Sequence, residues 1–396
     1  MRYAGIDVAA EKHAVAVVDE EGQVLQRPAL FGEDAEGYAR VRAALGSTEG
    51  LVVALEATGH YWQNLVATLL ADGYAVALLN PLRTRRFAEE DLARAKTDEI
   101  DALVIARMAA QKRLGPTALP DAVTQQLREA VRLRERIQQE IGDKVRQLHR
   151  LVDLGFPELT RHIRTLDTML ATAILREYPT AEAFRRTSKG KLARLCYDGR
   201  RKVGDELAHA LVEAANVSVG RHHAAVYQVQ VRYLCDDLDT LRRRLREIDK
   251  DIGRMLEAHE VGRLLTTIDG IGDTAAANLV AELGDLSRFP DASAVACYVG
   301  VVPGTDRSGK RRPLRSPLCP LGSARLRKAL WMPTLAAVQR NPWLRAYYQG
   351  LRARGKPAKV ALIAAMRKLL HAVFSVAKNR RPFTPLLPPA PHPPHA

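Results

Sequence analysis

Cysteine is scarce in this chain of 396 residues. The four cysteines, Cys196, Cys235, Cys297 and Cys319, are widely separated and form no CxxC pair. This pattern argues against a zinc site and against a disulfide framework, both of which need cysteines at characteristic spacings. Unpaired cysteines are typical of proteins in a reducing compartment, so we expect a cytoplasmic location.

Long apolar runs are also missing from the sequence. No run reaches the roughly 20 residues that span a bilayer. The first residues lack the basic-then-apolar layout of a secretory signal. We therefore expect no membrane-spanning segment and no membrane partner.

Acidic residues are absent from the C-terminal part. From Arg307 to the C-terminus there are 19 Lys or Arg and no Asp or Glu, whereas the preceding 306 residues hold 41 Lys or Arg against 45 Asp or Glu. Such a basic region favours a polyanion, because each cation that neutralises a phosphate releases counterions. An anionic membrane is the competing partner, but the region has no long amphipathic segment with a lipid anchor. We therefore favour nucleic acid.

The length is enough for two or three domains, and the first of them alternates strand and helix patterns. Short strands are expected at 3–8, 13–18, 24–25, 51–55 and 75–79, and helices at 33–45, 60–70, from Pro81 onward and at 98–113. This order is typical of an α/β sheet flanked by helices.

Two carboxylates share one face of the last of these helices. In KTDEIDALVIARM, residues 96–108, Asp98 and Asp101 are three residues apart and border the apolar stripe. Like charges held close together resist joint ionisation unless a cation is present. Asp7 and Glu56, each at the end of an apolar run, would stand on adjacent strands that face this helix. Solvated surface carboxylates are the common alternative, but four in this order predict a divalent-metal site.

Two long helical patterns occupy the middle of the chain. The first covers 127–152, and the second, 227–255, has apolar residues that alternate spacings of four and three. A heptad pattern of this kind predicts a coiled coil, and we expect the two helices to pair with each other or with another subunit. One long helix packed inside its own domain is the alternative. Residues 156–220 form a mostly helical insert between the two.

The third region opens with LLTTIDGIGDTAAANLVAEL, residues 264–283. Gly270 and Gly272 lie in a turn between two helical stretches, which is the pattern of a helix-hairpin-helix. Glycines in such a turn let backbone amides approach a phosphate, while the next helix offers its N-terminus. An ordinary helix connection that contains glycine is the alternative.

A strongly basic loop follows and leads into further helices. Ser308 lies in this loop, where a serine by itself would be a phosphate contact or a solvated residue. The cations expected to contact nucleic acid are Arg307, Lys310, Arg311, Arg312, Arg315, Arg327 and Lys328. Aromatic residues accompany the later cations and could stack on bases, although aromatics at helical spacing more often belong to a core. These aromatics are Trp331, Trp343, Tyr347 and Tyr348.

These motifs together resemble one known family. Asp7, EATG at 56–59 and KTDEIDA at 96–102 resemble the RuvC-like domain, of the RNase H-like class, that begins the DEDD insertion-sequence transposases. Residues 298–335 resemble the C-terminal domain of the same transposases, in which a GxxPxxxxSG segment precedes a basic loop, a glycine and an LRxAL helix. Here those elements are Gly300, Pro303, Ser308 and Gly309, then Gly322 and 326–330.

The resemblance implies an enzyme that cuts and rejoins DNA strands to move an insertion element. It implies Mg²⁺ held by Asp7, Glu56, Asp98 and Asp101, and it places Ser308 as the nucleophile of a covalent DNA intermediate. It also implies a guide RNA encoded by the element, which pairs with donor and target DNA. The protein would be a homo-oligomer, from dimer to tetramer.

The expected organisation has four parts. These are an α/β RNase H-like (RuvC-like) metal-binding domain at 1–115, a helical coiled-coil region at 116–260 with the insert 156–220, a mostly α C-terminal transposase domain with the helix-hairpin-helix and the serine at 261–383, and a disordered Pro-rich tail at 384–396.

Two rival classes of function remain open. A nuclease similar to a Holliday-junction resolvase would use the carboxylates to activate water, and Ser308 would only contact phosphate. A non-catalytic nucleic-acid scaffold would use the basic region and the coiled coil alone. The four carboxylates argue against the scaffold, and the long C-terminal region argues against a minimal resolvase.

Overall fold

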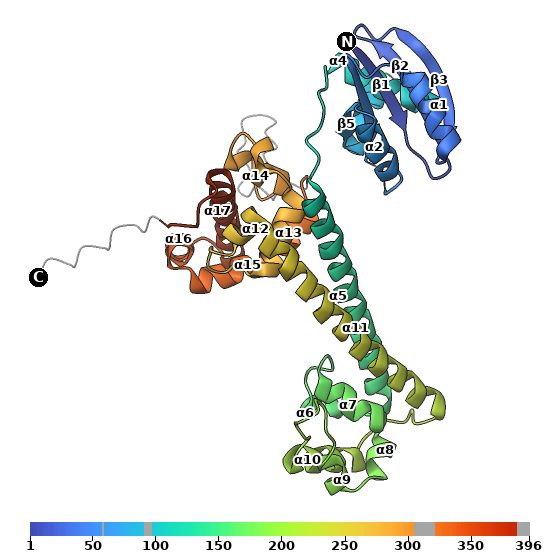
Figure 1. Cartoon of the computed structure of the whole chain (residues 1–396). Helices are drawn as coiled ribbons and strands as arrows, with labels where there is room; N and C mark the ends of the chain where they lie inside the picture. Colours follow the sequence, from blue (N-terminus) through green and yellow to red (C-terminus); the bar gives the residue numbers. More distant parts are fainter. Residues whose placement is uncertain (58, 91–96, 305–320, 386–396) are drawn as a thin grey trace, which may run out of the picture. The chain divides into compact units, whose positions relative to one another are not determined.

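The chain divides into two units, Met1–Leu119 and Pro120–Ala396, and each is described by itself. The structure is a computed structural model, and it describes residues 1–57, 59–90, 97–304 and 321–385 (Figure 1). The prediction of a disordered tail therefore falls, from residue 386 on, outside the described residues.

A five-stranded mixed sheet organises the first unit. Its strands are β1 (Arg2–Asp7), β2 (Lys12–Asp19), β3 (Val24–Gly32), β4 (Leu51–Glu56) and β5 (Ala75–Leu79), in the order β3-β2-β1-β4-β5. The pairs β1–β2 and β2–β3 are antiparallel, whereas β1–β4 and β4–β5 are parallel. The helices are α1 (Ala35–Leu45), α2 (Trp62–Ala71), α3 (Pro81–Glu90) and α4 (Asp98–Gln111). This mixed α/β arrangement is compatible with the predicted RNase H-like domain.

Alternation along the strands separates two apolar layers. Ile6 and Leu55 belong to the layer that includes residues of α1 and α2, whereas Tyr3 and Ala54 belong to the layer that includes residues of α4. Helix α4 crosses β1 closely at Gly5. A methyl group on Gly5 would lie 2.1 Å from the carbonyl oxygen of Ala102, so only glycine permits this approach.

Strand β3 is longer than the predicted 24–25, since it continues to Gly32. The sequence LQRPALF hides the strand because Arg27 and Pro28 interrupt its alternation. Pro28 is tolerated because β3 is at the edge of the sheet. The register with β2 also shifts next to it, between Val15 and Val17.

Two helices of 34 residues, α5 (Ala122–Gly155) and α11 (Ala225–Ala258), dominate the second unit. They pack side by side (Figure 1). Ion pairs join Arg134 to Asp249 at 2.5 Å and Lys144 to Asp237 at 2.6 Å, so the two helices run antiparallel. Their seam buries residues from both helices: Leu127, Ile137, Ile141, Leu148, Val231, Leu234, Leu238, Leu241 and Ile252. The helices thus pair within one chain, while a supercoiled geometry and a pairing between subunits stay predictions.

The insert between α5 and α11 consists of short helices. They are α6 (Leu159–His162), α7 (Met169–Glu177), α8 (Ala181–Arg185), α9 (Lys189–Ala193) and α10 (Asp205–Asn216). Their apolar residues form one core with the C-terminal half of α5 and the N-terminal half of α11, and Phe156 and Phe184 stack there with ring centroids 5.0 Å apart. The insert is therefore packed onto the helix pair.

The C-terminal region is helical in its described parts. It contains α12 (Glu260–Leu265), α13 (Asp273–Leu283), the 3-10 turn η1 (Leu286–Arg288), α14 (Ala292–Val299), α15 (Ala324–Arg340), α16 (Pro342–Ala353) and α17 (Ala358–Asn379). These elements share a core with the N-terminal end of α5 and the C-terminal end of α11.

Helix α17 is, among the described residues, the one helix with the length and mean composition of a membrane span. Arg367 and Lys368 interrupt its apolar residues, so it contains no continuous apolar run of about 20 residues. Leu369, Leu370 and Val373 are buried in the C-terminal core, so packing within the protein accounts for the apolar character of this helix.

Candidate active site and nucleic-acid interface

Asp7 and Glu56 end two neighbouring parallel strands. The register pairs Ile6 with Leu55, so the next residues, Asp7 and Glu56, lie at the same level of the sheet. Both follow the alternation of Tyr3 and Ala54 and thus point to the face covered by α4. The prediction that they stand on adjacent strands is confirmed by this register.

Asp98 and Asp101 lie in the first turn of α4. The Thr97 hydroxyl caps this helix and accepts a hydrogen bond from the Ile100 N–H at 3.3 Å. Acidic side chains in a first turn also interact favourably with the helix dipole, and this would stabilise α4 without any metal. Asp98 is exposed and Asp101 is half-buried.

The direction of α4 brings its N-terminus toward the strand ends with Asp7 and Glu56. Ala102 packs against Ala14, which is the cross-strand partner of Asp7. Ala109, two turns further along α4, belongs to the cluster that contains Tyr3, near the other end of β1. The helix therefore runs opposite to β1, and the four predicted carboxylates share one edge of one face of the sheet.

The donor set at this edge fits a hard divalent cation, because all four side chains offer carboxylate oxygens. The side chains are not drawn together into a finished cage, however. Within the described residues, no three His, Cys, Asp or Glu side chains form a group that could hold a metal ion. Topology and chemistry thus support the site, and its coordination geometry stays a prediction.

Thr84 is a partner of Glu56 that sequence reasoning missed. Its hydroxyl donates to Glu56 Oε1 and lies 3.0 Å from the carbonyl oxygen of Pro81. Thr84 is buried on α3. It fixes one oxygen of the carboxylate, and only the fold reveals this contact, because residues 56 and 84 lie far apart in sequence.

A second polar group holds the loop that follows Asp7. The Ala9 N–H donates to His13 Nδ1 at 3.3 Å, which leaves Nε2 of this buried histidine to donate to Glu33 Oε2 at 2.7 Å. The Tyr38 hydroxyl and the Asn64 amide donate to the other oxygen of Glu33. Burial by itself would raise the pKa of Glu33, but the hydrogen bonds from Tyr38, His13 and Asn64 outweigh it and hold this pKa below its ordinary value. We name His13, Glu33, Tyr38 and Asn64 the His13 network.

The predicted nucleophile and most of its cationic neighbours lie outside the described residues. These are Ser308 with Arg307, Lys310, Arg311, Arg312 and Arg315. The described segments on either side of them meet at two glycines. A methyl group on Gly322, where φ is +114°, would lie 2.7 Å from the Cα of Gly300. Because neither residue has a side chain, the backbone at Gly300 can pack closely against the backbone at Gly322. This is a physical reason for both glycines of the motif.

The turn between α12 and α13 contains Gly270 and Gly272. Gly270 has φ +101°, and a methyl group there would lie 2.5 Å from the backbone of Ala337 on α15. Packing against α15 thus explains Gly270 without a phosphate. Gly272 is exposed, caps the N-terminus of α13 and has open space around it, so it remains the better candidate for a phosphate contact.

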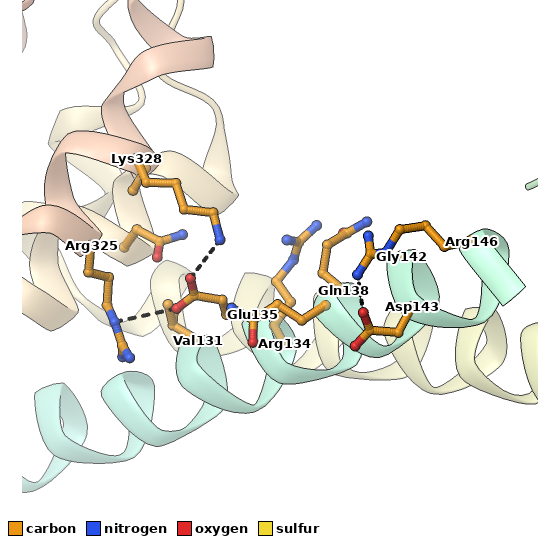
Figure 2. Close-up of a pocket in the computed structure, with 12 residues that line it drawn as sticks. Val131, Arg134, Glu135, Gln138, Gly142, Asp143, Arg146, Arg325 and Lys328 are labelled. Carbon is orange, nitrogen blue, oxygen red and sulfur yellow. Dashed lines mark hydrogen bonds and ion pairs between the residues drawn. The ribbon is translucent and has the colours of Figure 1, made fainter.

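Arg327 and Lys328 begin α15 and have partners inside the protein. Arg327 Nη1 donates to the Val299 carbonyl oxygen at 3.0 Å. Lys328 lies 3.0 Å from Glu135, which also pairs with Arg325 at 3.4 Å. Figure 2 shows Arg325 and Lys328 directed at Glu135, in a groove of about 560 Å³ between α5 and α15. Exposed pairs of this kind are worth little, so Lys328 can exchange Glu135 for a phosphate.

Known protein families match both ends of the chain. A transposase family, that of the IS110 DEDD transposases, matches residues 4–157, and the "Transposase IS116/IS110/IS902 family" matches residues 262–349. The first match contains the four carboxylates, and the second contains Ser308 and the glycines described above. The fold and the site thus define a DNA transposase, or recombinase, of the DEDD class. This class is generally metal-dependent, and transposases act on DNA.

Similar proteins extend over nearly the whole chain. The uncharacterized 44.8 kDa protein of insertion element IS116 from Streptomyces clavuligerus is 28% identical, over 98% of this chain and 97% of its own length. The putative transposase of the IS117 mini-circle from Streptomyces coelicolor is 28% identical over 97% of each chain. A pilin gene-inverting protein from Moraxella bovis is 24% identical over 96% of this chain and 97% of its own. The two family matches and these relatives identify the chain as a DEDD-type insertion-sequence transposase.

Proposed function

We propose that this transposase cuts and rejoins DNA strands with groups from both ends of its chain. Asp7, Glu56, Asp98 and Asp101 would bind Mg²⁺, and Ser308 would be the nucleophile. The observation that supports this most strongly is the shared edge of the sheet at which the strand register and the direction of α4 gather the four carboxylates. The helix dipole accounts for acidic residues in the first turn of α4, but it does not account for Asp7 and Glu56 at the neighbouring strand ends.

Each part has a distinct chemical role in the proposal. Mg²⁺ bound by the carboxylates would supply neutralisation of charge at the scissile phosphate. Ser308 Oγ forms a bond to phosphorus while one phosphorus–oxygen bond to deoxyribose breaks, and the departing DNA oxygen leaves as a hydroxyl. The phosphodiester energy is conserved in the serine linkage, so a DNA hydroxyl can later reverse the step and rejoin strands. Asp98 or Asp101 would accept the serine proton and pass it to the departing DNA oxygen, which balances the step.

The proposal includes partners that follow from the family resemblance. An RNA encoded by the element would pair with donor and target DNA and guide the enzyme in the cytoplasm, and the protein would act as a dimer or tetramer. The cationic C-terminal region, with no carboxylate after residue 306, supports a nucleic-acid partner of either kind. A non-coding segment beside the gene, able to pair with the element end and the insertion site, is the feature to seek.

A covalent intermediate separates this proposal from a nuclease that uses water. Full-length protein is incubated with Mg²⁺ and a plasmid that contains the element ends, and a protein–DNA adduct should survive denaturant and disappear with protease. Ser308→Ala should abolish the adduct and recombination together, and Ser308→Cys should retain a small fraction. Ser316→Ala, a serine in the same segment, is the matched control and should behave as wild type. If Ser308→Ala cuts DNA at the normal rate and leaves free phosphate ends, water is the nucleophile.

A further inference from the structure

A groove lies between α15 and α17. It measures about 550 Å³, a size typical of small-ligand sites. Trp331, Met332, Ile363 and Met366 line it. Met366 is buried, whereas Met332 is 67% exposed to solvent. The described residues thus leave an apolar surface, which includes part of the half-buried Trp331, open on this part of the molecule.

Cations surround this apolar surface. Arg327, Lys328 and Lys359 also line the groove. Lys359 is exposed and has no hydrogen-bond or ion-pair partner in the described ranges, and Lys328 has only its exposed pair with Glu135. No Asp or Glu occurs anywhere in α15, α16 or α17. The occupant should therefore combine an apolar, planar surface with negative charge.

We propose that this groove, named the Trp331 groove, receives an unstacked base of single-stranded DNA. The base would lie against Trp331 and Met332, and its flanking phosphates would contact Lys359 and Lys328. Stacking of a base on an aromatic side chain contributes about 1–3 kcal/mol and tolerates any sequence. The inference rests on the activity as a DNA transposase, because strand exchange exposes unpaired bases.

A second copy of the chain fits this groove less well. The same three cations would face their counterparts, or other cations of this carboxylate-free region, across a symmetric contact. Like charges brought together in that way are costly. A DNA strand supplies the opposite charge, and a paired duplex keeps its bases stacked, so single-stranded DNA is the expected ligand.

The test compares two DNA probes on the full-length protein. Fluorescence anisotropy measures the affinity for a labelled thymidine oligonucleotide of about 12 nucleotides and for a blunt duplex. Trp331→Leu keeps apolar volume but removes the aromatic face, and it should weaken single-strand binding roughly tenfold or more while duplex binding stays unchanged. Trp331→Phe should retain most of the affinity. Tyr233→Leu, which removes an aromatic ring at an exposed site on α11 outside the groove, should alter neither affinity.

Several outcomes would overturn the assignment. Equal single-strand affinity of Trp331→Leu and wild type would refute it, as would a loss seen only with a uridine RNA oligonucleotide. A changed oligomeric state by light scattering, with unchanged single-strand affinity, would assign the groove to a contact between copies. If wild type binds duplex DNA and Trp331→Leu binds single-stranded DNA as tightly as wild type does, only the groove proposal fails. If wild type binds no DNA, the proposed function fails as well.

Thermal melting shows whether Trp331→Leu folds. If it does not fold, a crosslinking measurement on the wild-type protein tests the groove instead. An oligonucleotide with 5-iododeoxyuridine is crosslinked by light, and the modified peptides are identified by mass spectrometry. A crosslink at Trp331 supports the groove. Crosslinks confined to residues outside 327–366 contradict it.

Discussion

The N-terminal unit and the C-terminal region carry opposite net charges. Residues 1–119 contain 13 Lys or Arg against 17 Asp or Glu, and four of these carboxylates gather at one edge of the sheet. From Arg307 on, the chain has 19 cations and no carboxylate. The first arrangement attracts cations, and the second attracts anions such as phosphates.

Under the proposed function, this difference assigns catalysis to the carboxylates of the N-terminal unit and DNA binding to the cations of the C-terminal region. A carboxylate cluster repels DNA phosphates, so a protein that places such a cluster at a scissile bond needs strong cationic contacts elsewhere. In the C-terminal helices the cations have few competing partners, because no acidic side chain is interspersed among them. In the N-terminal unit, the close packing of α4 against β1 at Gly5 determines where Asp98 and Asp101 lie relative to the strand ends.

Gly5→Ala should have the largest effect, because it changes the packing that positions the carboxylates of the N-terminal unit. The new methyl group would lie 2.1 Å from the Ala102 carbonyl oxygen and 2.3 Å from the Ala106 nitrogen, so α4 must move away from β1. Overpacking against backbone should lower the free energy of unfolding of the N-terminal unit by about 3 kcal/mol or more and displace Asp98 and Asp101. Gly115→Ala, which meets no atom within 4 Å, is the control. Matching denaturation curves for the two variants would show that this close approach does not position α4.

The charge asymmetry can be tested with single cations at the two ends. Lys310→Gln should reduce the slope of log affinity for DNA against log salt by about 0.9, the loss of one phosphate contact. Lys112→Gln removes the same charge from an exposed site in the N-terminal unit and should leave the slope unchanged. Titrations at several salt concentrations measure both. Equal slope changes would mean that the two regions share the phosphate contacts.

A smaller effect is expected at the His13 network. Since the folded-state pKa of Glu33 is lowered, its ionised form stabilises the fold above the ordinary pKa, near 4.5, and this stabilisation is lost as pH falls through the folded-state value. Glu33→Gln should lower the free energy of unfolding by about 1–2 kcal/mol at pH 7. The difference from wild type should shrink in acid. A difference that stays constant from neutral to acidic pH would show that the charge of Glu33 is not involved.

Much of the fold could be predicted because its signals are local. The apolar runs that end at Asp7 and Glu56 are strands in the structure, and the helix expected at 98–113 matches α4, Asp98–Gln111. Buried strands and amphipathic helices reveal themselves through periodicity within one segment. Edge strand β3 does not, because a half-exposed strand with a proline has little periodicity to detect.

The supporting contacts could not be predicted, because each joins residues far apart in the chain. The Thr84–Glu56 hydrogen bond spans 28 residues, and the His13–Glu33 pair needs the arrangement of β2 relative to the segment before α1. At Gly270 the sequence left two readings open, a phosphate contact and an ordinary helix connection. The left-handed backbone of Gly270 and its close approach to Ala337 provide a packing reason for the glycine, and the phosphate contact stays a prediction.

The central claim is that the carboxylate edge of the N-terminal unit is the catalytic metal site. Its most direct test is strand cleavage by Asp101→Asn in Mg²⁺, compared with Glu99→Gln from the same turn of α4. Asn is nearly the same shape as Asp but lacks the charge, so the fold should persist by circular dichroism while cleavage falls to background. Glu99→Gln should cut like wild type, and a chelator should stop both wild type and this control. Full cleavage by Asp101→Asn in Mg²⁺ would contradict the assignment.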